Sequence, residues 1–240
     1  LIMNTPISNI KPAAVISFEG NATKLRACMH AISSWVSPII IVHSENDKYI
    51  EQIAGEFKVS TYIYATSETS ANWSAGLTQI NKKWVLLIRS NEVITGQLRK
   101  TIVEKIKSNE KDSCQFKLPL TLVFLKKRLK YSLDWYESKP SCLAYLLKNN
   151  DSLNQLPRKY RSFDGELIRY SEDTLSECTK IVLKKAEEKA NNLAKNKEVF
   201  SFSSLFLRGV ISSIKEFNKV YFLKKGFKEG FEGAVFAVCE

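Results

Sequence analysis

The sequence predicts an α/β fold, in which a mixed, mainly parallel sheet is flanked by helices and followed by a C-terminal helical tail. Short apolar runs alternate with segments of helical periodicity between Ala13 and Ile88. Each apolar run ends in polar residues, which is typical of the buried strands of parallel sheets. A chain of 240 residues, of which 44% are hydrophobic, can also bury one substantial core.

The apolar runs are short and rich in β-branched residues, so they predict strands, and the periodic segments between them predict helices. Ligands of such sheets bind beyond the carboxyl ends of the strands. Residues 17–21, 43–47 and 89–92 follow three of these ends and therefore define one candidate cleft. Strands are expected at residues 14–16, 39–42, 59–64, 84–88 and 115–124, and helices at residues 25–32, 50–57, 73–80, 93–107 and 173–196.

Residues 199–240 are expected to form a separate, basic and aromatic helical tail after a sheet domain of residues 1–198. One helical stripe of this tail is apolar, and lysines lie beside it. Such a helix either packs on a core or lies on an anionic lipid surface with its apolar face down. The stripe consists of Leu205, Phe206, Val210, Ile214, Phe217 and Tyr221, and the lysines are Lys215, Lys219, Lys224 and Lys225.

The formal charge of +11 and the pI near 9.3 predict a polyanionic neighbour: nucleic acid, an anionic membrane or a phosphorylated substrate. No nucleic-acid recognition motif accompanies the charge, so nucleic acid is not expected as a partner. The five cysteines are widely spaced without a Cys-x-x-Cys pair, and neither His30 nor His43 has neighbours suited to a metal. Because no secretion signal and no run of about 20 apolar residues is present, we expect a cytosolic protein with reduced thiols.

Three segments carry a resemblance to a known family. Residues 217–230 combine aromatic and basic residues with a Gly-Phe-x-x-Gly ending, and Asn72, Ala75 and Leu77 match an Asn-x-Ala-Leu helix. Residues 84–92 take the place of a Trp-Val-Leu-x-Leu-Asp-Ala-Asp-Glu strand end. In their order and spacing these segments resemble family 2 glycosyltransferases of the GT-A type, which are Rossmann-like, and in particular the lipopolysaccharide-core transferases.

The resemblance implies an enzyme that moves a sugar from a nucleotide-sugar donor to a lipid-linked or lipopolysaccharide-core acceptor. It implies a peripheral protein at the inner face of the cytoplasmic membrane, which favours the membrane interpretation of the tail. The family holds a divalent cation, Mg²⁺ or Mn²⁺, with two aspartates. Arg89 and Asn91 stand in their positions, and a guanidinium repels a cation, so no metal ligand is assigned.

The resemblance also implies the residues of the site. Asp134 takes the place of the acceptor-side base, because deprotonating a sugar hydroxyl needs a carboxylate within hydrogen-bond reach. Arg169 stands where the family often has a histidine. The implied nucleotide-sugar-binding residues are Ser17, Phe18 and Glu19 at the first strand end, His43 and Ser44 at the second, Asn72 in the helix, and Arg89, Asn91 and Glu92 at the last.

Each of these residues also has a simpler interpretation. Arg89 either replaces the charge of the metal on a diphosphate, since its fork fits phosphate oxygens, or is a solvated arginine in an inactive site. Glu92 is either a residual metal ligand or a partner of the dipole of the next helix, and we favour the dipole. Asp134 and His43 are otherwise a turn cap and a structural histidine. The alternative function is therefore a pseudo-glycosyltransferase that serves as an interaction or scaffold protein.

Overall fold

The computed structural model describes residues 11–44, 47–64, 69–108, 115–130, 145–148, 163–195 and 202–239. The chain divides into two compact units. The first comprises Leu1–Leu120 and Lys139–Arg169, and the second comprises Thr121–Ser138 and Tyr170–Glu240. This division differs from the expected boundary between residues 198 and 199, because the second unit also takes two segments from the middle of the chain.

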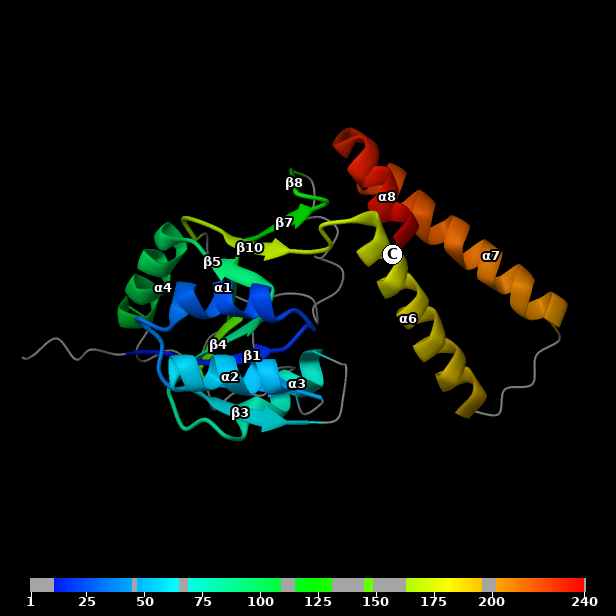
Figure 1. The fold of residues 1–240 in the computed structure, drawn as a ribbon. Helices are drawn as coiled ribbons and strands as arrows, with labels where there is room; N and C mark the ends of the chain where they lie inside the picture. The colour runs from blue at the N-terminus through cyan, green and yellow to red at the C-terminus, as the bar shows by residue number, and fades with distance from the viewer. Residues whose placement is uncertain are drawn as a thin grey trace, which may run out of the picture. The chain divides into compact units, whose positions relative to one another are not determined.

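A six-stranded sheet forms the centre of the first unit, in the order β3-β2-β1-β4-β9-β6. Its strands β1, β3 and β4 are labelled in Figure 1. The four strands from β3 to β4 are parallel, β9 is antiparallel to β4, and β6 is antiparallel to β9. The α/β class and the mixed, mainly parallel sheet are therefore confirmed. The strands are β1 (Ala13–Ser17), β2 (Ile39–His43), β3 (Ser60–Ile63), β4 (Trp84–Arg89), β6 (Gln115–Lys117) and β9 (Tyr145–Lys148).

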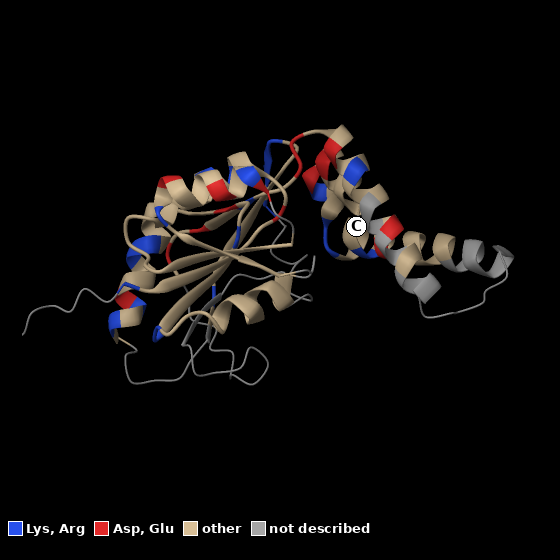
Figure 2. Cartoon of the chain, turned by 60° about the horizontal axis from the view of Figure 1, so that its bottom comes forward, with Lys and Arg blue, Asp and Glu red and all other residues tan. Residues whose placement is uncertain are grey.

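The strands β1, β2 and β4 are apolar along nearly their whole length because both faces of the sheet are covered. Figure 2 shows most of the Lys, Arg, Asp and Glu residues on helices and loops, with little charge along the central strands. Local signals begin two of the helices: the side chain of Asn21 accepts a hydrogen bond from Lys24 N, and that of Asp47 accepts one from Tyr49 N. The helices of this unit are α1 (Ala22–Ile32), α2 (Lys48–Phe57), α3 (Thr69–Leu77) and α4 (Gly96–Ser108).

The direction in which strands are added reverses beside β1. The chain runs from β1 through β2 to β3 on one side, and then returns to place β4 on the other side of β1. Crossovers between parallel strands are right-handed, so a reversal of direction puts the following helix on the opposite face of the sheet. The gap between the carboxyl ends of β1 and β4 is thus the topological switch point, where α/β sheets bind their ligands.

Two expected elements differ from the structure. The helix expected at residues 93–107 begins later, at Gly96, because β5 (Glu92–Ile94) pairs antiparallel with β10 (Leu167–Tyr170). The strand expected at residues 115–124 is two strands, β6 and β7 (Leu120–Phe124). Between them lies Pro119, which has no N–H to donate to a ladder, and whose carbonyl accepts a hydrogen bond from Leu167 N.

The second unit has a core of its own, built by a hairpin and helices. The hairpin consists of β7 and β8 (Lys127–Leu129), joined by Leu125 and Lys126 in the left-handed region. Buried residues of this core are Leu122, Phe124, Leu129, Cys178, Val220, Phe236 and Ala237. The helices are α6 (Leu175–Lys195), α7 (Phe202–Asn218), the π-helix η2 (Lys219–Leu223), the 3₁₀-helix η3 (Gly226–Glu229) and α8 (Phe231–Cys239).

The apolar stripe of the tail is divided between two environments. Phe217 and Tyr221 pack against the core of the second unit, whereas Val210 and Ile214 are exposed. The stripe therefore combines core packing with an uncovered apolar surface. Within the described ranges, no helix has both the length and the apolar character that crossing a membrane requires.

We predict that Gly76→Ala destabilises the first unit. A Cβ at this position of α3 would collide with Cγ1 of Val15 and come within 3.0 Å of Cγ2 of Val42. Overpacking of this kind costs about 1–3 kcal/mol, against a gain of about 0.4–1 kcal/mol from the stiffer unfolded chain. Gly55→Ala in α2 is the control, because its Cβ would meet nothing within 4 Å. Urea denaturation checks the prediction, and equal effects of the two changes would contradict it.

Candidate functional site

The switch point brings Ser17 and Arg89 together, because they are partners in the register of β1 with β4. Ser17 is buried at the end of β1, and Asn72 Nδ2 of α3 donates a hydrogen bond of 3.1 Å to its Oγ. This bond holds the amide of Asn72, which is only 3% exposed, beside the strand end. The sequence reasoning placed both residues at the site, and the structure brings them into direct contact.

Two buried amide oxygens at this edge have no hydrogen-bond partner in the described part of the chain. They are Oδ1 of Asn72 and Oδ1 of Asn91, the latter in the turn that follows β4. A buried polar atom without a partner is costly, and in a native structure it calls for an explanation. Both atoms are acceptors, so a ligand with hydroxyl or N–H donors would satisfy them.

The turn after β4 is fastened to the end of β1 by Ser90. Its N–H donates to the carbonyl of Ser17 at 2.9 Å, and its Oγ accepts a hydrogen bond from Glu19 N at 2.8 Å. Ser90 is fully buried, which makes these bonds a rigid link between the two strand ends. Sequence reasoning included Ser90 in the strand end at residues 89–92 but gave it no role there.

A cation and an anion face each other across the same edge. Nη1 of Arg89 lies 3.5 Å from Oε1 of Glu19, and Thr69 Oγ1 donates to that oxygen at 3.0 Å. The side chains of Arg89 and Glu19 are 16% and 26% exposed, so solvent reaches both. Sequence reasoning missed Thr69, which opens α3. The arrangement gives an accessible guanidinium, held in place by the protein's own carboxylate.

Glu92 has a different role from the helix-dipole partner expected from the sequence. It lies in β5 rather than at the start of a helix, it is fully buried, and its Oε1 accepts hydrogen bonds from Arg169 Nε at 2.8 Å and Nη2 at 2.5 Å. Its other oxygen accepts the N–H of Arg89 at 2.8 Å. Both carboxylate oxygens of Glu92 are thus engaged inside the fold, and the buried pair ties β5 to β10.

The Cys28 thiol of α1 lies beneath this edge. Burial, and to a smaller extent the charge of Glu92, raises its pKa well above the ordinary value. The thiol therefore stays protonated and is a donor, with its sulfur 3.7 Å from the carbonyl oxygen of Arg89. This weak contact links α1 to Arg89, the last residue of β4.

The remaining predicted residues fall on the second strand end and beyond. Phe18 N donates to the carbonyl of Val42, and His43 is 2% exposed at the end of β2, followed by the exposed Ser44. Burial of His43 supports its structural interpretation, while a contact of Phe18, His43 or Ser44 with a ligand stays a prediction. Asp134 lies outside the described residues.

The donors at this edge do not suit a divalent cation. Mg²⁺ and Mn²⁺ prefer carboxylate oxygens, but Glu92 is enclosed with Arg169 and Glu19 is paired with Arg89. The guanidinium of Arg89 adds a positive charge at the strand end. The arrangement suits an anionic ligand that also carries hydroxyl groups, which would donate hydrogen bonds to the two amide oxygens.

No protein family and no curated protein matches the sequence. Among solved structures, S. aureus TarS 1-349 is 12% identical, with 72% of this chain and 64% of that chain covered and a TM-score of 0.44. Glucosyl-3-phosphoglycerate synthase from Mycobacterium tuberculosis, in complex with Mn²⁺, uridine-diphosphate-glucose and phosphoglyceric acid, is 11% identical, with coverages of 58% and 57% and a TM-score of 0.42. A cytidylyltransferase from Leptospira borgpetersenii serovar Hardjo-bovis is 9% identical, with coverages of 80% and 99% and a TM-score of 0.42. The chain spans less than two thirds of the first two structures, and with TM-scores below 0.5 these likenesses assign neither family nor function.

We predict that Arg169→Met lowers the free energy of unfolding by about 3–5 kcal/mol, because it leaves Glu92 as an uncompensated buried charge. The control is Arg26→Met, since the pair of Arg26 with Glu56 is exposed at the surface and contributes about 1 kcal/mol or less. Chemical denaturation measures both. Similar small losses in the two variants would show that the buried pair does not hold β5 and β10 together.

Proposed function

We propose that the chain is a glycosyltransferase that binds a nucleotide-sugar donor at the switch point between β1 and β4. The observation that carries the proposal is that Arg89 and the two unsatisfied amide oxygens of Asn72 and Asn91 lie at one sheet edge. A nucleotide sugar supplies both complements: a diphosphate for the guanidinium and hydroxyl groups for the amides. The sequence resemblance to family 2 glycosyltransferases points to the same ligand.

In the proposed reaction, an acceptor hydroxyl attacks the anomeric carbon of the donor sugar. The bond from that carbon to the diphosphate breaks, and its electron pair leaves with the nucleoside diphosphate. Arg89 stabilises the charge that develops on the leaving group. Asp134, expected from the resemblance, takes the proton of the acceptor hydroxyl.

A pseudo-glycosyltransferase is the second candidate, and one observation favours it. Both carboxylates at the described edge are engaged within the protein, Glu19 with Arg89 and Glu92 with Arg169. A protein whose charges are paired in this way can keep the fold without catalysing a reaction, and can serve as an interaction or scaffold protein. Donor binding separates the two candidates.

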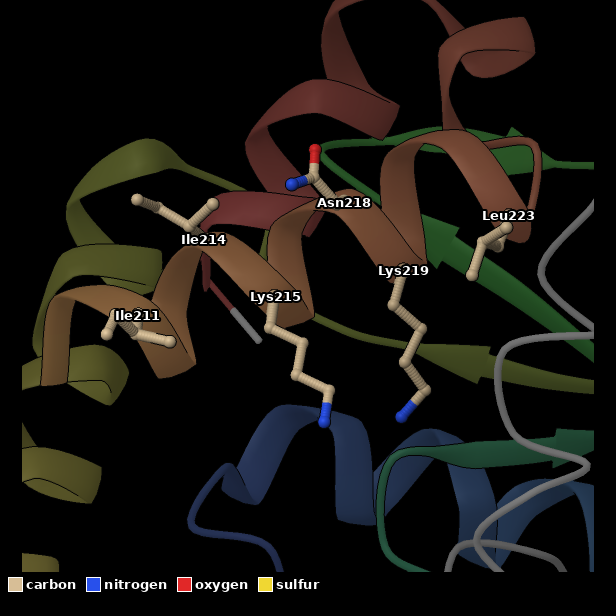
Figure 3. Close-up of a pocket in the computed structure, with 6 residues that line it drawn as sticks. All are labelled: Ile211, Ile214, Lys215, Asn218, Lys219 and Leu223. Carbon is tan, nitrogen blue, oxygen red and sulfur yellow. The ribbon is translucent and has the colours of Figure 1, made fainter. Parts of the chain in front are cut away.

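The acceptor is proposed to be a lipid-linked or lipopolysaccharide-core molecule, met at the anionic inner face of the cytoplasmic membrane. A groove on α7 and η2 supports this proposal; it is lined by Ile211, Ile214, Lys215, Asn218, Lys219 and Leu223 (Figure 3). Ile211 and Leu223 are 57% and 79% exposed, and Lys215 and Lys219 lie between them along the helix. Apolar side chains beside lysines suit a surface of anionic lipid.

We predict that donor binding does not need a metal but needs Arg89. Calorimetry with the nucleotide sugar that stabilises the protein most in a thermal-shift screen is expected to give equal affinity with Mn²⁺ and with EDTA, because Arg89 supplies the compensating charge. Arg89→Ala should abolish the binding, whereas Arg89→Asp with Asn91→Asp should make it dependent on metal. Mn²⁺-dependent binding by the unmodified protein would contradict the proposal, and no binding of any donor would favour the pseudoenzyme.

We predict that the groove binds vesicles containing anionic phospholipid in a salt-sensitive way. Lys215→Gln with Lys219→Gln should weaken binding roughly thirtyfold, since each lysine near such a surface contributes about 1 kcal/mol. The control is Lys100→Gln with Lys107→Gln, which removes the same charge from α4. Equal weakening by the control pair, or equal binding to neutral vesicles at high salt, would remove the proposed role of the groove.

A further inference from the structure

The carboxylate of Glu19 contacts two groups of the kind that proteins use to bind anions. Its Oε1 receives a hydrogen bond from Thr69 Oγ1 at 3.0 Å and lies 3.5 Å from Nη1 of Arg89. A guanidinium and a hydroxyl at the start of a helix are groups that proteins use to bind phosphate. Here both are directed at a side chain of the protein itself.

The surroundings of Glu19 allow the side chain to leave without a change in the backbone. Its N–H is fixed by Ser90 Oγ at 2.8 Å, so the main chain is held independently of the carboxylate. The side chains of Glu19 and Arg89 are both partly exposed. Rotation of one side chain into solvent would therefore release Nη1 of Arg89 and the Thr69 hydroxyl from this carboxylate together.

A second observation is a buried acceptor, in the same helix as Thr69, without a hydrogen-bond partner among the described residues. Asn72 lies in α3, the nine-residue helix that Thr69 opens, and its Oδ1 has no partner in the described part of the chain although the residue is 97% buried, being 3% exposed. The hydrogen bond from its Nδ2 to Ser17 Oγ holds this amide at the end of β1. An acceptor without a partner thus lies in the helix whose first residue, Thr69, contacts Glu19.

We propose that Glu19 is a built-in competitor for the diphosphate of the donor: the ligand binds by displacing this carboxylate from Arg89 and Thr69. The inference rests on the proposed donor site and adds a control of its affinity. Glu19 keeps the guanidinium compensated when the site is empty, and it excludes anions too weakly charged to displace it. A diphosphate, which carries more charge than the carboxylate, completes the exchange.

Titration of the full chain with inorganic pyrophosphate tests the exchange. Glu19→Gln keeps the size of the side chain and an acceptor for Thr69 but removes the competing charge. We expect it to bind pyrophosphate about five- to tenfold more tightly than the unmodified protein, the gain expected from releasing one partly exposed ion pair and its repulsion of the ligand. Glu56→Gln is the matched control, because it removes the same charge from the exposed pair with Arg26 and should leave affinity unchanged.

The possible results are distinct. Tighter binding by Glu19→Gln alone, lost again when Arg89→Ala is added, supports the exchange. Equal, Arg89-dependent binding by the unmodified protein and Glu19→Gln overturns the exchange but keeps the donor site. If Glu56→Gln binds pyrophosphate as tightly as Glu19→Gln does, the effect is one of net charge, and the exchange is also overturned. Absence of pyrophosphate binding in every variant, with melting temperatures showing that each is folded, overturns both the exchange and the proposed donor site.

Discussion

The pairing of β1 with β4 is the constraint on which the site depends. Because the chain adds β2 and β3 on one side of β1 and β4 on the other, the carboxyl ends of β1 and β4 become neighbours although they are about seventy residues apart in the sequence. The register then sets Ser17 opposite Arg89, and Ser90 joins the two ends with two hydrogen bonds. Every other contact at the edge, including that of Arg89 with Glu19, builds on this link.

The two carboxylates at this edge each pair with an arginine, but one pair is buried and the other is partly exposed. Glu92 is buried with Arg169 and accepts the backbone N–H of Arg89. Loss of Arg169 as its partner would leave a buried charge without compensation. Glu19 faces Arg89 where solvent reaches both, and leaving its partner costs far less. The pair of Glu92 with Arg169 therefore suits a structural role, and the pair of Glu19 with Arg89 suits exchange with a ligand.

In the second unit, some apolar residues of the C-terminal helices pack into a core and others stay exposed. Phe217 and Tyr221 close onto a core that the β7–β8 hairpin shares with α8, and Lys127 of the hairpin bonds to the carbonyl of Glu229 and to Glu232. The hydrogen bond from Lys127 lowers the pKa of Glu232, so this contact is strongest above the ordinary pKa of a carboxyl and is lost as the pH falls through the lowered one. The apolar residues left over, among them Ile211 and Leu223, remain at the surface.

The sequence by itself determined the parts of the fold that depend on local pattern. The apolar runs at β1, β2 and β4 specify strands, since both of their faces are buried, and the polar residues that follow them specify the edge where the site lies. Only the tertiary structure decided that residues 92–94 form a strand, that Glu92 pairs with Arg169, and that the β7–β8 hairpin shares a core with the C-terminal helices. These features depend on partners about seventy or more residues away in the chain, and periodicity carries no information about which distant segments meet. The same reason hid the roles of Thr69 and Ser90, because their hydroxyls find their partners only when distant segments come together at the switch point.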